Sequence, residues 1–132
     1  EQMVNLHQKE KPSATIGIKK VKNPQQYGVA ELKKISKSKY QVIHAVEKPL
    51  NPRTDFALTG VNIFEPEIFD AIKKTKSGVK NETQLTDCIQ TLIDDKKTVL
   101  ASIMKQKDIC IDIGTPKNYY SAMKYSYNQK IS

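Results

Sequence analysis

Glycine is scarce in this sequence, and its five copies are widely spaced. They stand at positions 17, 28, 60, 78 and 114, so that no two lie closer than eleven residues. A phosphate-binding loop of the P-loop or dinucleotide-binding type needs several glycines within about six residues, because the backbone must approach the phosphates closely. The chain therefore cannot build either loop. If it handles nucleotides, the main grip on the triphosphate must lie elsewhere.

The length and composition predict one folded domain. The chain has 132 residues, of which 38% are hydrophobic and 27% are charged, as in an ordinary globular protein. No run of consecutive apolar residues exceeds three, whereas a membrane span needs about 18. The apolar core of a signal peptide is missing as well. We therefore expect a cytoplasmic protein without a membrane segment.

Stretches with the two-residue period of β-strands are interspersed with stretches of helical spacing. Strand patterns cover residues 14–19, 28–35, 40–48, 56–64, 99–104 and 109–113. The polar residues 36–39 predict a hairpin between the second and third strands. Helical patterns cover residues 3–10, 66–72, 85–93 and the region from Thr115 and Pro116 onwards. Because the order is not a strict βαβα alternation, we expect an α/β protein with a mixed β-sheet flanked by helices.

Two cysteines and two histidines offer little catalytic chemistry. Cys88 and Cys110 each lie within an apolar pattern, so we expect both to be buried thiols rather than a disulfide or a nucleophile. His7 and His44 have no Cys or carboxylate at metal-ligand spacing, which argues against a zinc site. We also expect no His–carboxylate pair, and hence no general base of that kind.

Five short motifs follow one another in a specific order. They are Tyr27-Gly28-Val29, Val46-Glu47-Lys48-Pro49, Ala57-Leu58-Thr59-Gly60-Val61, Gln84-Leu85-Thr86-Asp87 and Asp112-Ile113-Gly114-Thr115-Pro116. In this order and at these spacings, the motifs resemble the C-terminal half of the sugar-1-phosphate nucleotidyltransferase domain. This is the family of glucose-1-phosphate thymidylyl- and uridylyltransferases. The resemblance runs from about residue 4 to about residue 127.

The resemblance implies that residues 1–132 are the sugar-binding half of a Rossmann-like nucleotidyltransferase domain. The family's glycine-rich loop with its Arg, a downstream Lys and the first metal-binding Asp belong to an N-terminal half that this sequence lacks. The glycine spacing agrees with that division. A start at Glu1 agrees with a trimmed chain, although removal of a tag would give the same start. We expect this half to be inactive alone, with the missing half as its partner.

The resemblance also implies a reaction. An oxygen of the sugar 1-phosphate attacks the α-phosphorus of a nucleoside triphosphate, and pyrophosphate leaves. Positioning, Mg²⁺ and basic residues support a transfer of this kind. Glucose is the expected sugar, and UTP and dTTP both remain open as the nucleotide.

Three residues match the family's sugar-phosphate contacts. Glu47 matches the acidic residue that accepts hydrogen bonds from sugar hydroxyls, although a solvated charge at a strand end is the alternative. Lys48 matches the residue that contacts the sugar phosphate. Adjacent strand residues face opposite ways, so both can reach one ligand only if the strand breaks, and Pro49 favours a break. Gly28 matches a glycine whose backbone lies against the sugar, and a simple turn glycine is the alternative.

The remaining matches concern a metal, the pocket wall and the fold. Asp112 matches the Asp that helps to hold the catalytic Mg²⁺. Leu58 lies where the family contacts the sugar through the backbone, so its side chain could equally belong to the core. Asn62 occupies a position where thymidylyltransferases often carry Tyr against the sugar, which leaves the identity of the sugar open. We interpret the pair Thr86 and Asp87 as mainly structural.

Two other functions remain open. The formal charge of +8, with lysines clustered in 19–22, 33–39 and 73–80, is a feature of nucleic-acid-binding proteins. These lysines are scattered over several predicted elements, which favours a basic solvated surface, so we expect no nucleic-acid partner. A natural half-domain without catalysis, acting as a partner or regulator, is the second alternative. A half-domain that exposes a sheet edge or an apolar face would also form homo-oligomers.

Overall fold

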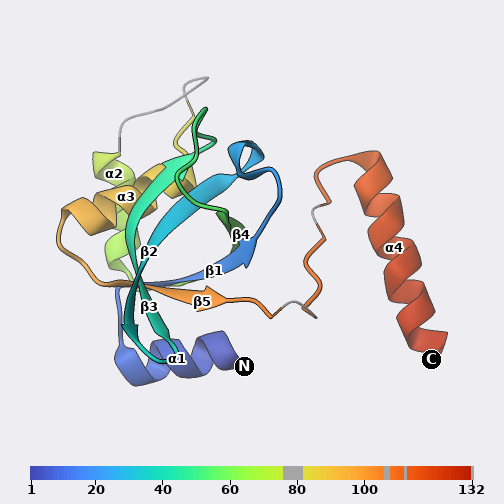
Figure 1. The fold of residues 1–132 in the computed structure, drawn as a ribbon, viewed down its shortest axis with the longest axis horizontal. Helices are drawn as coiled ribbons and strands as arrows, with labels where there is room; N and C mark the ends of the chain where they lie inside the picture. The colour runs from blue at the N-terminus through green and yellow to red at the C-terminus, as the bar shows by residue number, and fades with distance from the viewer. Residues whose placement is uncertain (76–81, 106–107, 112, 132) are drawn as a thin grey trace.

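The computed structural model describes residues 1–75, 82–105, 108–111 and 113–131 (Figure 1). The strands are β1 (Ala14–Lys20), β2 (Gly28–Ser36), β3 (Lys39–Glu47), β4 (Phe56–Phe64) and β5 (Val99–Ile103). The helices are α1 (Gln2–Glu10), α2 (Glu67–Lys74), α3 (Leu85–Asp94) and α4 (Pro116–Ile131), and a 3₁₀ turn, η1 (Pro24–Gln26), precedes β2. The four predicted helices and the first five predicted strands are therefore confirmed.

The five strands form one mixed sheet that closes on itself in the order β1-β4-β2-β3-β5. β1 and β5 run parallel, whereas the other pairings in the described residues are antiparallel. The predicted hairpin is confirmed, because β2 and β3 pair from Gly28 opposite Glu47 to Ser36 opposite Lys39. This register places the start of β2 and the end of β3 side by side.

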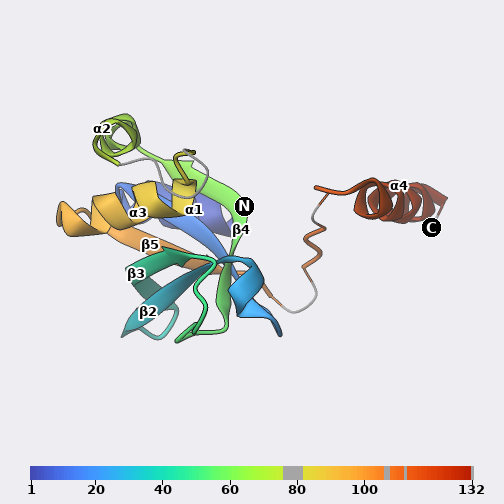
Figure 2. The same ribbon diagram turned by 90° about the horizontal axis from the view of Figure 1, so that it is seen from above.

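Three helices lie on one side of the sheet, as Figure 2 shows for α1, α2 and α3. α3 packs on β3, and α2 packs on α3. Cys88, Ile89 and Leu92 of α3 are buried, at the spacing that the sequence predicts. They join Ile16 and Ile18 of β1 in the hydrophobic core. Full burial of such aliphatic side chains stabilises the fold by about 1.5–3 kcal/mol each. The expected sheet with flanking helices is thus confirmed.

A buried histidine joins α1 to the sheet. His7 Nδ1 lies 2.8 Å from Thr15 Oγ1 of β1, and Nε2 lies 3.0 Å from Glu65 Oε1, directly after β4. The expectation that the chain has no His–carboxylate pair is therefore wrong. The two residues are 58 positions apart in the sequence and meet only through the packing of α1 against the sheet.

The segment after β5 differs from the sequence prediction. No strand is present at residues 109–111 or 113, where the sequence predicts one over 109–113. Alternation alone does not give a segment a partner strand, and the five strands already pair with one another around the closed sheet. α4 stands apart from the sheet in Figures 1 and 2.

α4 begins where the sequence predicts, with Thr115 as its N-cap. The backbone N–H of Asn118 donates to Thr115 Oγ1 over 3.2 Å, which satisfies one free donor of the first turn. Among the helices in the described part of the chain, none is long and apolar enough to cross a membrane.

Candidate functional site

A pocket of about 570 Å³ lies where β2 begins, β3 ends and β4 passes beside them. Its walls include four residues that the sequence analysis predicts as substrate contacts, Gly28, Glu47, Lys48 and Leu58. Lys19 of β1 adds a second cation to the wall. The pairing of β1, β2, β3 and β4 brings residues from four places in the sequence to one cavity, and Cys110, Ile111 and Ile113 line it from the segment after β5.

The break in β3 that the sequence analysis requires is present. β3 ends at Glu47, and Lys48 has a φ of +43°, in the left-handed region that non-glycine residues rarely adopt. The backbone N–H of Lys48 donates to the carbonyl of Tyr27 over 3.0 Å. Both side chains therefore reach the same pocket, and Lys48 Nζ lies 3.7 Å from Glu47 Oε1.

Thr86 of α3 contacts Glu47 directly. Its hydroxyl donates to Glu47 Oε2 over 2.6 Å. Thr86 is 6% exposed, whereas the Glu47 side chain is 23% exposed and borders the pocket. The Gln84–Asp87 motif singles out this segment, but the prediction that Thr86 is mainly structural does not include the contact with Glu47. The two residues are 39 positions apart and meet only because α3 packs on β3.

Position 28 has no room for a side chain. A Cβ at this position would lie 2.5 Å from Thr86 Oγ1 and 2.8 Å from Glu47 Oε2. Both distances are shorter than ordinary van der Waals contacts. Glycine is therefore the residue that lets α3 and the end of β3 approach each other here.

Two acidic groups, Glu47 and Asp87, and one cation, Lys48, lie near this end of the pocket and differ in solvent exposure. Burial raises the pKa of the Asp87 carboxyl, and the negative charge of Glu47 raises it further. Lys48, with 64% of its side chain exposed, faces Glu47 from the solvent side. A carboxylate with a nearby cation suits a ligand that carries hydroxyl donors next to an anionic group.

Two predicted site residues do not join this group. Asn62 is not part of the pocket wall but pairs with Ile16 across β1 and β4, and its Oδ1 is buried without a hydrogen-bond partner among the described residues. Asp112 lies outside the described residues, although its neighbours Ile111 and Ile113 border the pocket. The assignments of Asn62 to the sugar and of Asp112 to Mg²⁺ stay predictions.

The cysteines differ in their surroundings. Cys88 is buried in the core, as expected. Cys110 is only partly buried, because the segment after β5 runs along the pocket instead of entering the sheet, and its Sγ lies 3.9 Å from the carbonyl oxygen of Thr59. The expectation of a buried Cys110 is therefore wrong.

The described residues do not by themselves form a metal centre. Among them, no group of three His, Cys, Asp or Glu side chains is arranged to hold a metal ion. A Mg²⁺ ion needs oxygen ligands in octahedral geometry, of which substrate phosphates commonly supply several. This part of the chain does not provide a complete set.

Comparison with known proteins decides the family. The model of the Nucleotidyl transferase family matches residues 1–129. The chain belongs to this family. This nucleotidyltransferase chain is 38% identical to a low-salt glycan biosynthesis nucleotidyltransferase of Haloferax volcanii over 82 residues, which cover 62% of the chain and 22% of that protein. It is 34% identical to a glucose-1-phosphate thymidylyltransferase of Streptomyces griseus over 94 residues, which cover 71% of the chain and 25% of that protein.

Solved structures of nucleotidyltransferases share the fold. A UDP-glucose pyrophosphorylase complexed with UDP-glucose is similar with a TM-score of 0.82 and 30% identity, over 97% of this chain and 48% of that one. The apo form of a UDP-glucose pyrophosphorylase gives a TM-score of 0.85 and 29% identity, over 98% and 47%. The chain therefore spans about half the length of these structures. The family resemblance and the Rossmann-like mixed α/β fold are confirmed.

Proposed function

We propose that this chain is the sugar-phosphate-binding half of an enzyme that joins a sugar 1-phosphate to a nucleoside triphosphate. The observation that carries the proposal is the left-handed Lys48, which turns two successive side chains, Glu47 and Lys48, into one pocket. Membership of the nucleotidyl transferase family supports it. So does the likeness to a UDP-glucose pyrophosphorylase whose structure contains UDP-glucose.

Each pocket residue has a proposed task. Glu47 accepts hydrogen bonds from the sugar hydroxyls, because a carboxylate offers only acceptors. The Lys48 ammonium offsets the charge of the sugar phosphate. The backbone at Gly28 and Leu58 forms the wall against which the sugar lies. The proposed sugar is glucose, and the proposed nucleotide is UTP or dTTP.

The proposed reaction needs little from this half beyond positioning. An oxygen of the sugar phosphate forms a bond to the α-phosphorus, the bond from the α-phosphorus to the bridging oxygen breaks, and pyrophosphate leaves. Holding the two reactants in line supplies much of the rate acceleration in such transfers. The proposed partner is the remaining half of the domain, which would hold the triphosphate. A cytoplasmic location, where nucleoside triphosphates are available, belongs to the same proposal.

Mg²⁺ enters the proposal through Asp112 alone. Its carboxylate would be one oxygen ligand, and the phosphates and the remaining half of the domain would supply the others. When bound, the ion neutralises phosphate charge in such a reaction. We derive no step through it, because the described residues hold no complete ligand set.

The test is to titrate glucose 1-phosphate into the longest natural gene product that contains these residues and to measure pyrophosphate release with UTP and dTTP. Glu47→Gln keeps the size of the side chain and removes its charge. We expect it to weaken glucose 1-phosphate binding by about tenfold or more, as for a lost charge-assisted hydrogen bond. Glu67→Gln is the matched control. Glu67 is on α2, forms an ion pair with Lys97 and does not line the pocket.

Other outcomes would replace the proposal. Equal affinities for wild type and Glu47→Gln would contradict the assignment of the pocket. Binding of glucose 1-phosphate without any pyrophosphate release from the longest gene product would favour the non-catalytic half-domain. Affinity for a DNA or RNA oligonucleotide that falls steeply with salt, without sugar-phosphate binding, would favour the nucleic-acid-binding alternative.

A further inference from the structure

The hydrogen bond from Thr86 to Glu47 joins α3 to the end of β3 beside the pocket. Its length is 2.6 Å, and both partners are partly or fully shielded from solvent. Short hydrogen bonds from a hydroxyl to a carboxylate are among the stronger ones in proteins. This bond fixes one carboxylate oxygen, Oε2, and leaves Oε1 on the side of Lys48.

Three elements are needed to make this bond. Glu47 is the last residue of β3, Gly28 is the first residue of β2 and lies opposite it, and Thr86 is in the first turn of α3. A Cβ at position 28 would meet Thr86 Oγ1 and Glu47 Oε2 together. Glycine at this position therefore makes room for the bond itself, in addition to any approach of the sugar.

Without this bond, Glu47 has a competing partner. Lys48 Nζ lies 3.7 Å from Oε1, longer than the 2.7–2.9 Å of a charge-assisted hydrogen bond. A carboxylate released from Thr86 can rotate towards this ammonium and shorten the contact. The carboxylate would then turn away from the sugar, and the ammonium would be less available to a phosphate.

Asp87 adds a reason for holding the carboxylate in place. Its pKa is raised by burial and by the negative charge of Glu47, so the two carboxyl groups are close enough to repel each other when both are ionised. The hydrogen bond from Thr86 to Oε2 holds the Glu47 carboxylate in place beside this charge.

We propose that Thr86 is a positioning residue that holds Glu47 towards the sugar hydroxyls and keeps Lys48 available for the phosphate, and that residue 28 is glycine because this bond requires the space. The inference rests on the proposed function of Glu47. It predicts that the Thr86 hydroxyl affects substrate binding although it touches no substrate atom.

The first experiment compares Thr86→Val, Thr86→Ser and Thr91→Val in the longest natural gene product. Valine keeps the shape of threonine without the donor, and serine keeps the donor. We expect Thr86→Val to raise the KM for glucose 1-phosphate by about tenfold with little change in kcat, and Thr86→Ser to restore a KM near that of wild type. Thr91 is the matched control on the same helix, because its hydroxyl contacts Thr75 and the carbonyl of Asp87 but not Glu47.

A double-mutant cycle separates positioning from general stability. If Thr86 acts through Glu47, the effect of Thr86→Val on KM should disappear in the Glu47→Ala background, which has no acceptor for the hydroxyl. Additive effects, or an equal rise in KM for Thr91→Val, would overturn the inference. An unchanged KM for Thr86→Val would overturn it as well, while a large effect of Glu47→Gln would leave the proposed function standing. An unchanged KM for Glu47→Gln would contradict both the inference about Thr86 and the proposed function.

A second route covers the case in which Thr86→Val does not fold. Gly28→Ala approaches the same bond from β2, where its Cβ meets Thr86 Oγ1 and Cγ2 as well as Glu47 Oε2. We expect Gly28→Ala to raise the KM for glucose 1-phosphate, and Thr86→Ala to remove most of that additional effect. An equal effect of Gly28→Ala with threonine and with alanine at position 86 would contradict the role of the bond.

Discussion

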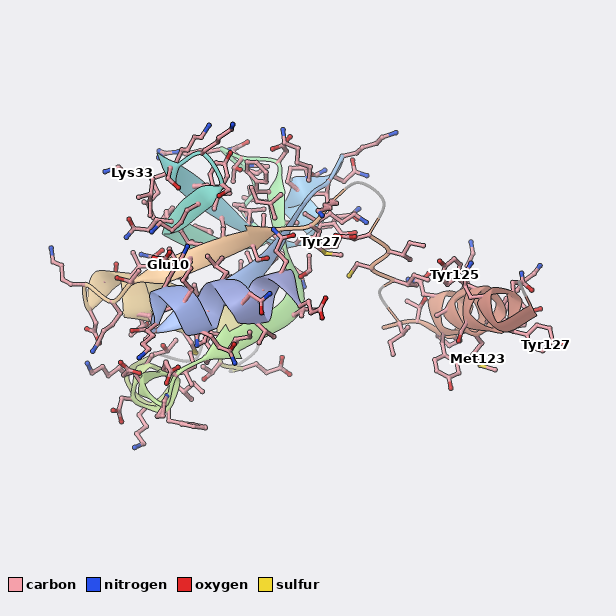
Figure 3. All side chains as sticks on the ribbon, turned by 90° about the horizontal axis from the view of Figure 1, so that it is seen from below. Glu10, Tyr27, Lys33, Met123, Tyr125 and Tyr127 are labelled. Carbon is pink, nitrogen blue, oxygen red and sulfur yellow. The ribbon has the colours of Figure 1, made fainter. Side chains whose placement is uncertain are left out.

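α3 and α4 are both predicted from the sequence, but they differ in what they bury. Ile89 of α3 is completely shielded from solvent and lies in the core between the sheet and α2. Tyr127 of α4 is 68% exposed, and Figure 3 shows Met123, Tyr125 and Tyr127 well away from the sheet. The apolar face of α3 has a partner within the chain, and that of α4 has none in the described residues.

The comparison shows where the stability of each helix originates. Tertiary packing stabilises α3, because its buried side chains gain the free energy of leaving water. α4 has 16 residues and depends on local terms, chiefly its backbone hydrogen bonds and the Thr115 cap. Isolated helices shorter than about 12–15 residues are marginal in water, and α4 is only slightly longer than that. The two helices should therefore respond differently to the same kinds of change.

The largest difference is expected from truncation of one apolar side chain in each helix. Ile89→Ala should lower the free energy of unfolding by about 2–5 kcal/mol, because it leaves a cavity in the core. Met123→Ala, the matched change in α4, should alter it by less than about 0.5 kcal/mol. Urea denaturation of both variants measures the difference. Equal losses would mean that α4 is packed against another part of the protein in solution.

A smaller and purely local effect is expected at the start of α4. Thr115→Ala removes the cap of Asn118 N–H and should weaken the helix by about 1 kcal/mol. The cooperative unfolding of the sheet should not change, because α4 lies outside it. Far-UV circular dichroism reports the helix, and denaturant titration followed by near-UV signals from the body reports the sheet. A parallel loss in both signals would contradict the independence of α4.

The pH dependence of stability should carry a contribution from α3. The pKa of Asp87 is raised in the fold by burial and by Glu47, so the folded chain keeps this proton to a higher pH than the unfolded chain. The stabilisation from the protonated carboxyl is complete below the unfolded pKa and is lost as pH rises through the folded pKa. Asp87→Asn should therefore gain stability relative to wild type as the pH rises from the unfolded pKa of the Asp87 carboxyl through its raised folded pKa. Asp94→Asn, on the exposed side of the same helix, is the control, and a constant difference between Asp87→Asn and wild type would refute the prediction.

The smallest effect is expected from removal of α4 altogether. A chain that ends before Thr115 should unfold at nearly the same denaturant concentration as the full chain, since no described side chain of α4 is buried. Trypsin should cut wild type first between β5 and the first turn of α4, where Lys105 precedes the helix and Lys117 lies in its first turn, both exposed. Protection of these sites would show that α4 is covered by a second copy or by another part of the protein.

The fold could be predicted where a local sequence pattern is enough to specify the element or the strand that it pairs with. The spacing of Cys88, Ile89 and Leu92 specifies a helix with one buried face, and the polar residues 36–39 specify a hairpin between neighbouring strands. The strand predicted over 109–113 failed for the opposite reason. Alternation shows that a segment can pair, but it does not show which strand it pairs with. The order of the strands depends on distant pairings, such as that of β1 with β5.

The same distinction applies to the candidate site. Glu47 and Lys48 are adjacent, so the sequence alone shows that both can serve one ligand if the strand breaks, and the break is present. Thr86 could not be identified in this way, because its contact with Glu47 depends on how α3 lies on β3. Asn62 lies on a predicted strand, but its place opposite Ile16 follows from a register with an irregularity in β1.

The left-handed backbone at Lys48 sets the proposed binding of the phosphate against the stability of the fold. Lys11 and Lys96 also have positive φ, but each directly follows the end of a helix, α1 or the C-cap of α3, where such a conformation is common. Lys48 has no helix to end, and its side chain makes the conformation cost about 1 kcal/mol more than glycine would. Selection for heat resistance alone would therefore favour Gly at position 48. Such a selection would remove the Lys48 ammonium, and the proposed contact with the phosphate would be lost with it.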